Sequence, residues 1–329
     1  MRAAAAALLD RLDGPARARA RLSLADDRLR WLEYRPRPRP GVCLAELDTA
    51  ARKAAHRLLA AGLSRHAYAQ AMSIMALEEV LDRQEGWRRG RHSQDFWVVV
   101  FGDPDGDAWA WRFEGHHLSV TMTITGDRVD PAPVFLGANP AAVRAGADRT
   151  VLRPLAAEED LARAVLAALD PAGRSAAIVA DTAPADIRSG PAAEAGAPYT
   201  PLGVAGDRLA APARALLGEL VELYLTRLPD GLAAREADRL DPRELHFAWE
   251  GPTRPGLGHY YRVQGPDLLI EYDNTADGAN HAHTVLRRPR SDFGGDAFAA
   301  HRARVHHRTG APEPEVTHDG DRDDQPGHR

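Results

Sequence analysis

Along the first ninety residues, apolar positions recur with the period of an α-helix. Ser64 is the expected N-cap of one of these helices, in which Tyr68, Met72 and Met75 begin an apolar face. A preceding helix carries apolar residues at helical spacing, and Asp48-Thr49 caps it if it starts late. Helices are expected over 3–12, 16–24 and 44–61 and after Ser64, which makes residues 1–92 the helical part of the chain.

The period changes at Phe96, where short apolar runs separated by turn residues replace the helical spacing. Val120, Met122 and Ile124 alternate with serine and threonine, as in a strand with one apolar face. Expected strands are 96–101, 108–113, 118–125 and 134–136, followed by 245–249, 258–264, 268–272 and 281–286. Further helices are expected over 158–169, 209–228 and 297–306, with a long loop at 182–206 and a disordered tail at 309–329.

These elements predict an α+β fold, with an N-terminal helical segment and a largely antiparallel β core against which helices pack. We expect a single domain over 1–308, with its β-rich core over 93–308. The two strand blocks resemble each other faintly, because Ala110-Trp111 and Ala248-Trp249 occupy similar places. The likeness is too weak to establish a repeat, but it favours one shared antiparallel sheet or two packed sheets.

Composition narrows the classes of function. The chain has 329 residues and a formal net charge of -5, which does not favour general binding of nucleic-acid phosphates. Its apolar runs fall far short of the ~20 residues that span a bilayer, so we expect no membrane association. Asp10 and Arg11 directly follow the alanine-rich opening and leave no signal core, which favours a cytoplasmic location. Cys43 is the only cysteine, so an internal disulfide is excluded.

The 14 histidines are unusually many for this length, and they are partly gathered. His281 and His283 lie two residues apart on an expected strand, so both side chains point to one side of the sheet and can share a transition metal. His117 shares a face with Ser119 and becomes the third ligand if the strand blocks meet. His116 and His301 are expected as further ligands or as partners that orient one. This set indicates a site for zinc, iron or copper.

Acidic and basic residues near these histidines suggest the rest of a site. Glu271 lies on an apolar strand, where a carboxylate is costly to bury unless it is paired or functional. We expect it to act as a general base, to bind the metal or to orient a ligand, with Asp273 and His259 as secondary catalytic candidates. Asp273 equally suits a turn cap. Expected contacts to a polar or anionic substrate are Arg112, Tyr261 and Arg262.

Several long motifs occur in an order that resembles the domain-of-unknown-function 3500 family. They are Trp111–Ser119, Pro133–Pro140, and a block from Phe247 to His301 that includes His259–Arg262, Leu269–Asn274, Asn280–Thr284 and Asp292–Gly294. The resemblance covers roughly Leu29 to His307, and the family pattern has asparagine where this chain has Thr121. It implies no activity, but its motifs contain His116, His117, His281, His283 and His301 and none of the histidines of the tail.

The sequence therefore favours a metal-dependent enzyme, hydrolytic or oxidative, that acts on a small-molecule substrate. One alternative is a metal-free small-molecule-binding or structural protein in which the histidines form a buried hydrogen-bond network. Another is a metal-free acid–base enzyme that uses Glu271 with His259 or His117. The sequence leaves the oligomeric state open.

Overall fold

A computed structural model of the chain describes residues 1–146, 149–193, 195 and 200–295. In this described part, 13 strands form one mixed, mostly antiparallel sheet, and β8 and β9 form a separate pair. The helices are α1 Arg2–Leu9, α2 Gly14–Ala20, α3 Thr49–Gly62, α4 Arg65–Gln84, α5 Ala156–Ala168, α6 Pro171–Ala177, α7 Ala211–Leu225 and α8 Asp230–Ala237. The strands are β1 Arg21–Leu22, β2 Val42–Cys43, β3 Phe96–Gly102, β4 Ala108–Gly115, β5 Leu118–Thr125, β6 Arg128–Asp130, β7 Val134–Ala138, β8 Val143–Ala145, β9 Arg149–Leu152, β10 Ile178–Ala180, β11 Val204–Ala205, β12 His246–Glu250, β13 Tyr260–Gly265, β14 Leu268–Ala276 and β15 His281–Arg287.

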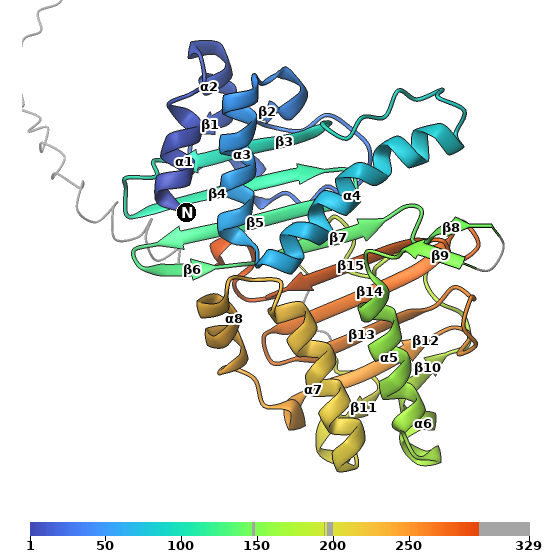
Figure 1. Cartoon of the computed structure of the whole chain (residues 1–329). Coiled ribbons are helices and arrows are strands. Elements are labelled where there is room, and N and C mark those ends of the chain that lie inside the picture. The colour runs from blue at the N-terminus through green and yellow to red at the C-terminus, as the bar shows by residue number, and fades with distance from the viewer. Residues whose placement is uncertain (147–148, 194, 196–199, 296–329) are drawn as a thin grey trace, which may run out of the picture.

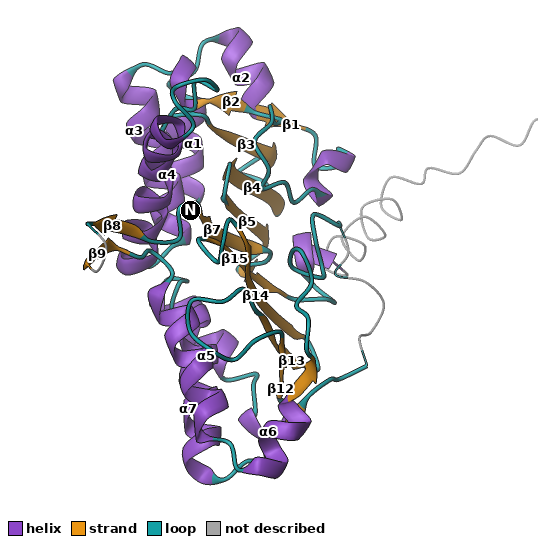
Figure 2. Cartoon of the chain, turned by 90° about the vertical axis from the view of Figure 1, so that its right-hand side faces the viewer, coloured by secondary structure: helices purple, strands orange, loops and turns teal. Residues whose placement is uncertain are grey.

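Helices cover one face of the large sheet and loops cover the other. In Figure 1, α3 and α4 cross the first group of strands, and α5 and α7 cross the second. Figure 2 shows these helices together on one side of the sheet. The main apolar core lies between helices and sheet, and it takes alternate residues of each strand, such as Val120, Leu136 and Ile270. The intervening residues, among them Thr121 and Glu271, therefore face the loops.

The two halves of the sheet repeat one pairing scheme about its centre. In the first half, Val42 pairs with Val98 across β2 and β3, and the same row continues through Phe113, Val120 and Val134. In the second half, the corresponding row runs from Val204 through Phe247, Val263 and Ile270 to Leu286. Val134 and Leu286, which end these rows, pair with each other, so β7 and β15 lie at a local two-fold axis.

Smaller features follow the same repeat. β1 runs parallel to β3 and pairs with it at Val100, two residues after Val98. β10 runs parallel to β12 and pairs with it at Trp249, two residues after Phe247. Gly41 and Gly203 both have positive φ, and a Cβ on either would lie within 2.4 Å of a strand carbonyl oxygen. Asp13 and Asp170 both cap the short second helix of their half. The structure therefore shows a repeat that the sequence alone does not establish.

The α+β prediction is confirmed, and both strand blocks belong to one sheet. Ser64 caps α4 through Ala67 N, and Asp48 caps α3 through Ala51 N, so the helix expected over 44–61 begins only at Thr49. The helix expected over 16–24 ends at Ala20, because the next two residues pair with β3. The expected terminal helix and tail lie outside the described residues. Among the described helices, none is long and apolar enough to cross a membrane.

Register corrects two details of the predictions. Ala110-Trp111 and Ala248-Trp249 are not equivalent, because the row through Phe113 and Val263 makes Arg112 equivalent to Arg262. His116 and His117 do not belong to a strand, so the strand face that His117 was expected to share with Ser119 does not position it. The two histidines form the turn between β4 and β5, with Gly115 and Leu118 paired on either side.

Candidate metal centre

The turn between β4 and β5 and the start of β15 bring three histidines together over β7. His117 belongs to the turn and has a φ of 62°, a left-handed conformation that is uncommon for a residue with a side chain. Its N–H donates to Tyr34 O at 3.0 Å, and its carbonyl accepts from Gly137 N at 2.7 Å. These two backbone bonds fix the turn, and with it the direction of the imidazole of His117.

Gly137 on β7 provides the space in which the rings meet. It pairs with His283 across β7 and β15. A Cβ at this position would lie 2.8 Å from Cδ2 of His117 and 3.1 Å from Cδ2 of His283. Because any side chain here would displace the imidazoles, the glycine is required by packing rather than by backbone conformation.

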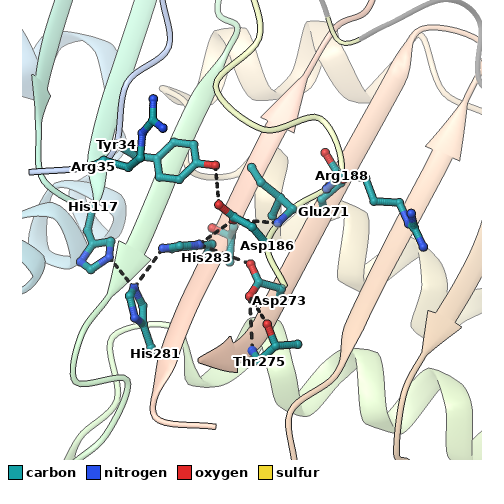
Figure 3. A network of polar contacts seen from close by, with 12 residues as sticks. Tyr34, Arg35, His117, Asp186, Arg188, Glu271, Asp273, Thr275, His281 and His283 are labelled. Atoms are coloured by element: carbon teal, nitrogen blue, oxygen red, sulfur yellow. Dashed lines mark hydrogen bonds and ion pairs between the residues drawn. The ribbon is translucent and has the colours of Figure 1, made fainter. Parts of the chain in front are cut away.

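The three Nε2 atoms converge. His117 Nε2 lies 2.8 Å from His281 Nε2, which lies 3.1 Å from His283 Nε2. Nitrogen ligands at 2.0–2.1 Å from a tetrahedral ion are about 3.3 Å apart, so this spacing is close to that of a coordination sphere. Figure 3 shows the rings directed toward one another. The arrangement fits three imidazole ligands of one ion.

Carboxylates contact the far sides of two rings, and those at His283 are drawn in Figure 3. Nδ1 of His283 lies 2.9 Å from Asp186 Oδ1 and 3.3 Å from Asp273 Oδ2. Nδ1 of His281 lies 3.0 Å from Asp277 Oδ2. Carboxylates accept, so each ring places a hydrogen on Nδ1, and in the neutral form of the ring the lone pair of Nε2 points at the shared centre. Carboxylate–histidine pairs of this kind orient metal ligands in proteins.

The local charges act differently on the three rings. Burial, reinforced by the neighbouring His116, His283 and His281, holds the pKa of His117 well below its usual range. Burial also lowers the pKa of His281. Burial opposes protonation of His283 as well, but its hydrogen bonds to Asp186 and Asp273 outweigh this effect and raise its pKa to about 9. Two neutral imidazoles thus lie beside one that attracts a cation or a proton.

Residues 1–295 match the protein family described as a protein of unknown function, DUF3500. The chain belongs to this family. The match confirms the resemblance carried by the sequence motifs, and it assigns no activity. A search of curated proteins and a search of solved structures each gave no match.

In this DUF3500 protein, the structure unites His117, His281 and His283, and it gives His116 a different set of contacts. His116 stacks on His117, with ring centroids 3.7 Å apart, but its Nδ1 contacts the carboxylate of Glu78. That carboxylate, His116 and His117 form a second group with metal-ligand spacing. His301 lies outside the described residues.

The two acidic candidates lie on β14 and face the loops, as their alternation predicts. Asp273 reaches His283, and its other oxygen is 3.3 Å from Thr275 N. Glu271 is buried and accepts from Arg188 N at 2.7 Å, from Ser189 N and from the hydroxyl of Tyr260 at 2.8 Å. Glu271 therefore holds the segment that carries Asp186 against the sheet, and its geometry suits positioning.

The remaining catalytic candidate, His259, lies on the helix-covered side of the sheet, away from the histidine cluster. Its ring stacks on Trp249 of the main core, with centroids 4.3 Å apart. Its Nδ1 lies 3.1 Å from Arg163 Nη2 and 3.2 Å from Leu257 O. The structure places it in packing rather than beside the cluster.

The three expected substrate contacts are all buried. Arg112 donates to the carbonyls of Arg28, Leu29 and Trp31 and has no exposed surface. Tyr261 lies under the helices and donates to Glu158 O at 2.8 Å. Arg262 faces the loops and donates to Thr200 O at 3.4 Å. None of these contacts involves the histidine cluster.

Four residues of the site were not predicted from the sequence: Tyr34, Asp186, Asp277 and Gly137. The hydroxyl of Tyr34 donates to Asp186 Oδ2 at 2.8 Å, while its carbonyl holds His117, so this residue ties both sides of the cluster. Gly137 stands inside a motif that carried the family resemblance. Asp277 is four residues before His281, and its turn position gave the only local signal. Asp186 belongs to a long loop and had none.

Proposed function

We propose that the protein is a metal-dependent enzyme acting on a small molecule, with a divalent transition metal held by His117, His281 and His283. The convergence of their three Nε2 atoms carries this proposal. Imidazole nitrogen suits zinc, iron and copper. Only His281 and His283 are partly exposed, with 18% and 13% of their side-chain surfaces accessible, so a ligand approaches from their side.

A metal-free hydrogen-bond network fits the same geometry less well. Nδ1 of His281 lies 3.0 Å from Asp277 Oδ2 and 3.2 Å from the amide nitrogen of Asn139. When its hydrogen is donated to Asp277, His281 has a single lone pair, on Nε2. That one lone pair faces two neighbouring nitrogens, at 2.8 Å and 3.1 Å. Without a cation it must accept from both His117 and His283, whereas a metal ion takes one lone pair from each ring. The crowding at His281 Nε2 therefore favours a metal.

The residues around the cluster have distinct parts in this proposal. Three protein ligands leave a coordination position open, which is typical of catalytic rather than structural metal sites. A bound metal supplies Lewis-acid activation of water or of a substrate oxygen, and iron or copper adds oxidative chemistry. Asp186 and Asp273 keep His283 oriented, and Asp277 does the same for His281. The identity of the metal decides between hydrolysis and oxidation.

The test is elemental analysis of the protein purified without a histidine tag. We expect one zinc, iron or copper per chain, and loss of that metal in the His281→Ala/His283→Ala variant. His66 and His92 are exposed histidines away from the cluster, so a His66→Ala/His92→Ala variant is the matched control and keeps its metal. Absence of metal, together with no thermal shift on adding zinc, iron, copper or manganese, overturns the proposal.

A further inference from the structure

A cavity of about 370 Å³ lies on the outer side of the β4–β5 turn, beside the candidate metal centre but not part of it. Its walls come from the 36–39 segment, α4, the 89–91 segment and β3. One of its lining residues is His116, whose ring stacks on His117. The polar and aromatic side chains of the lining include two carboxylates, Glu78 and Asp95, of which Glu78 is bound by Arg91 and His116. The cationic and aromatic ones are Arg37, Arg39, Arg89, Arg91, Trp97 and His116.

The fold repeat contains an equivalent cavity in the second half, of about 470 Å³. By the pairing rows, Trp97 corresponds to His246 and His116 to Pro266. Arg39, two residues before Gly41, corresponds to Pro201, two residues before Gly203. Both halves thus form a recess at the same hairpin. The second recess has one arginine in its lining, Arg290, whereas four arginines line the first.

Two of the four arginines have donors available for a ligand. The closest carboxylate contacts of Arg37 and Arg89 are made through Nε, at 3.2 Å to Glu33 and at 3.4 Å to Glu85. Their Nη groups take no part in these contacts, and the two side chains are 49% and 62% exposed. A guanidinium that keeps its Nη donors suits bidentate binding of a carboxylate.

The other walls offer a flat apolar surface and one more polar atom. Trp97 is half-buried, and the guanidinium of Arg39 lies 5.6 Å from its ring centroid. Pro36 and Pro38 line the same cavity. Nδ1 of His116 is held by Glu78, and its Nε2 contacts no other polar atom among the described residues. An indole face beside guanidinium groups favours a planar ring that carries negative charge.

We propose that this cavity binds a small aromatic carboxylate. Its ring lies against Trp97, and its carboxylate binds the guanidinium groups of Arg37 and Arg89. Nε2 of His116 is within the same cavity for a further hydrogen bond. The site does not require the metal, although its occupant lies one imidazole ring away from His117. Its volume is at the lower end of the range for small-molecule sites, which suits a ligand of one or two rings.

The experiment titrates benzoate into the full-length protein by calorimetry, once after chelation and once with metal added. We expect saturable binding with a Kd on the order of 1 mM, as the small size of benzoate allows. The Arg37→Gln/Arg89→Gln variant is expected to bind roughly tenfold more weakly, because it loses the charge-assisted bonds. Arg290→Gln, in the equivalent recess, is the matched control and keeps the affinity of the parent protein.

Three other ligands are compared with benzoate on the unmodified protein, so the outcome does not depend on any substitution near the cavity. Weaker binding of cyclohexanecarboxylate and of benzamide supports the aromatic and anionic requirements. Equal binding of inorganic phosphate overturns the aromatic carboxylate, and absence of saturable benzoate binding overturns the site. The His281→Ala/His283→Ala variant keeps its benzoate affinity under this proposal, so failure of the metal site and failure of this cavity give different results.

Discussion

Replacing Gly137 with alanine tests the candidate metal centre without removing any of its ligands. The added Cβ would lie 2.8 Å from Cδ2 of His117 and 3.1 Å from Cδ2 of His283. Carbon atoms in contact prefer about 3.5–4.0 Å, so His117 has to move by roughly 0.7 Å and His283 by roughly 0.4 Å. Gly137 lies on β7 and does not have positive φ, so alanine suits its backbone conformation, and the added Cβ would also lie 3.1 Å from the carbonyl oxygen of Ala282.

The magnitude follows from where this strain is relieved. Overpacking of this kind costs about 1–3 kcal/mol. Without metal, both rings can rotate away from the added Cβ, whereas a bound ion holds both rings in place. The contact with the backbone of Ala282 is the same in both states. The strain therefore weakens metal binding by about 1–3 kcal/mol, which is roughly 5- to 150-fold in Kd. Global stability changes less than metal affinity.

The assay measures the metal Kd by competition against a chromophoric chelator. In parallel, the absorption spectrum of the cobalt-substituted protein reports the geometry of the metal ligands. Gly218→Ala on α7 is the matched control, because a Cβ there meets nothing within 4 Å. An unchanged metal Kd in folded Gly137→Ala protein refutes the reasoning, since the two imidazoles would then not meet over this residue.

Three further predictions rest on contacts around the sheet. Asp186→Asn removes the charge that orients His283 and is expected to weaken metal binding about 10- to 100-fold in the same competition assay. Glu271→Gln weakens the hold on Ser189 N, so hydrogen exchange of that amide accelerates about tenfold or more; an unchanged rate contradicts the positioning role. Burial, together with the charge of Arg163, lowers the pKa of His259 to about 4, against about 6.5 when unfolded. The unfolded state then takes up a proton that the folded state refuses, so stability falls by up to about 3 kcal/mol as pH drops from about 6.5 to 4. Urea unfolding of His259→Phe lacks this loss if the assignment holds.

The part of the site that local periodicity controls was predictable. His281 and His283 share a side of β15 because side chains alternate along a strand, and Glu271 and Asp273 share that side of β14 by the same rule. The same rule also shows an inconsistency in the expected substrate contacts. Tyr261 and Arg262 are neighbours on β13 and must point to opposite faces, so one site on one face cannot use both.

The part that depends on loops was not predictable. Asp186 reaches His283 from a loop 97 residues earlier in the chain, and Tyr34 reaches Asp186 from another segment. A long loop has no period that reveals which of its polar residues return to the sheet. His117 lies beside His281, but strand alternation is not the cause, because the turn and the space over Gly137 bring the two rings together.

The internal repeat separates framework from site within a single chain. Arg112 and Arg262 occupy equivalent positions, are both buried and both donate to loop carbonyls, so the fold itself needs an arginine there. The turn His116-His117 corresponds to Pro266-Asp267, which bears no imidazole. A residue kept in both halves serves what the halves share, which is the sheet and its covering loops. The imidazoles of this turn occur in one half only, so the shared fold does not require them, and the proposed metal site accounts for their presence.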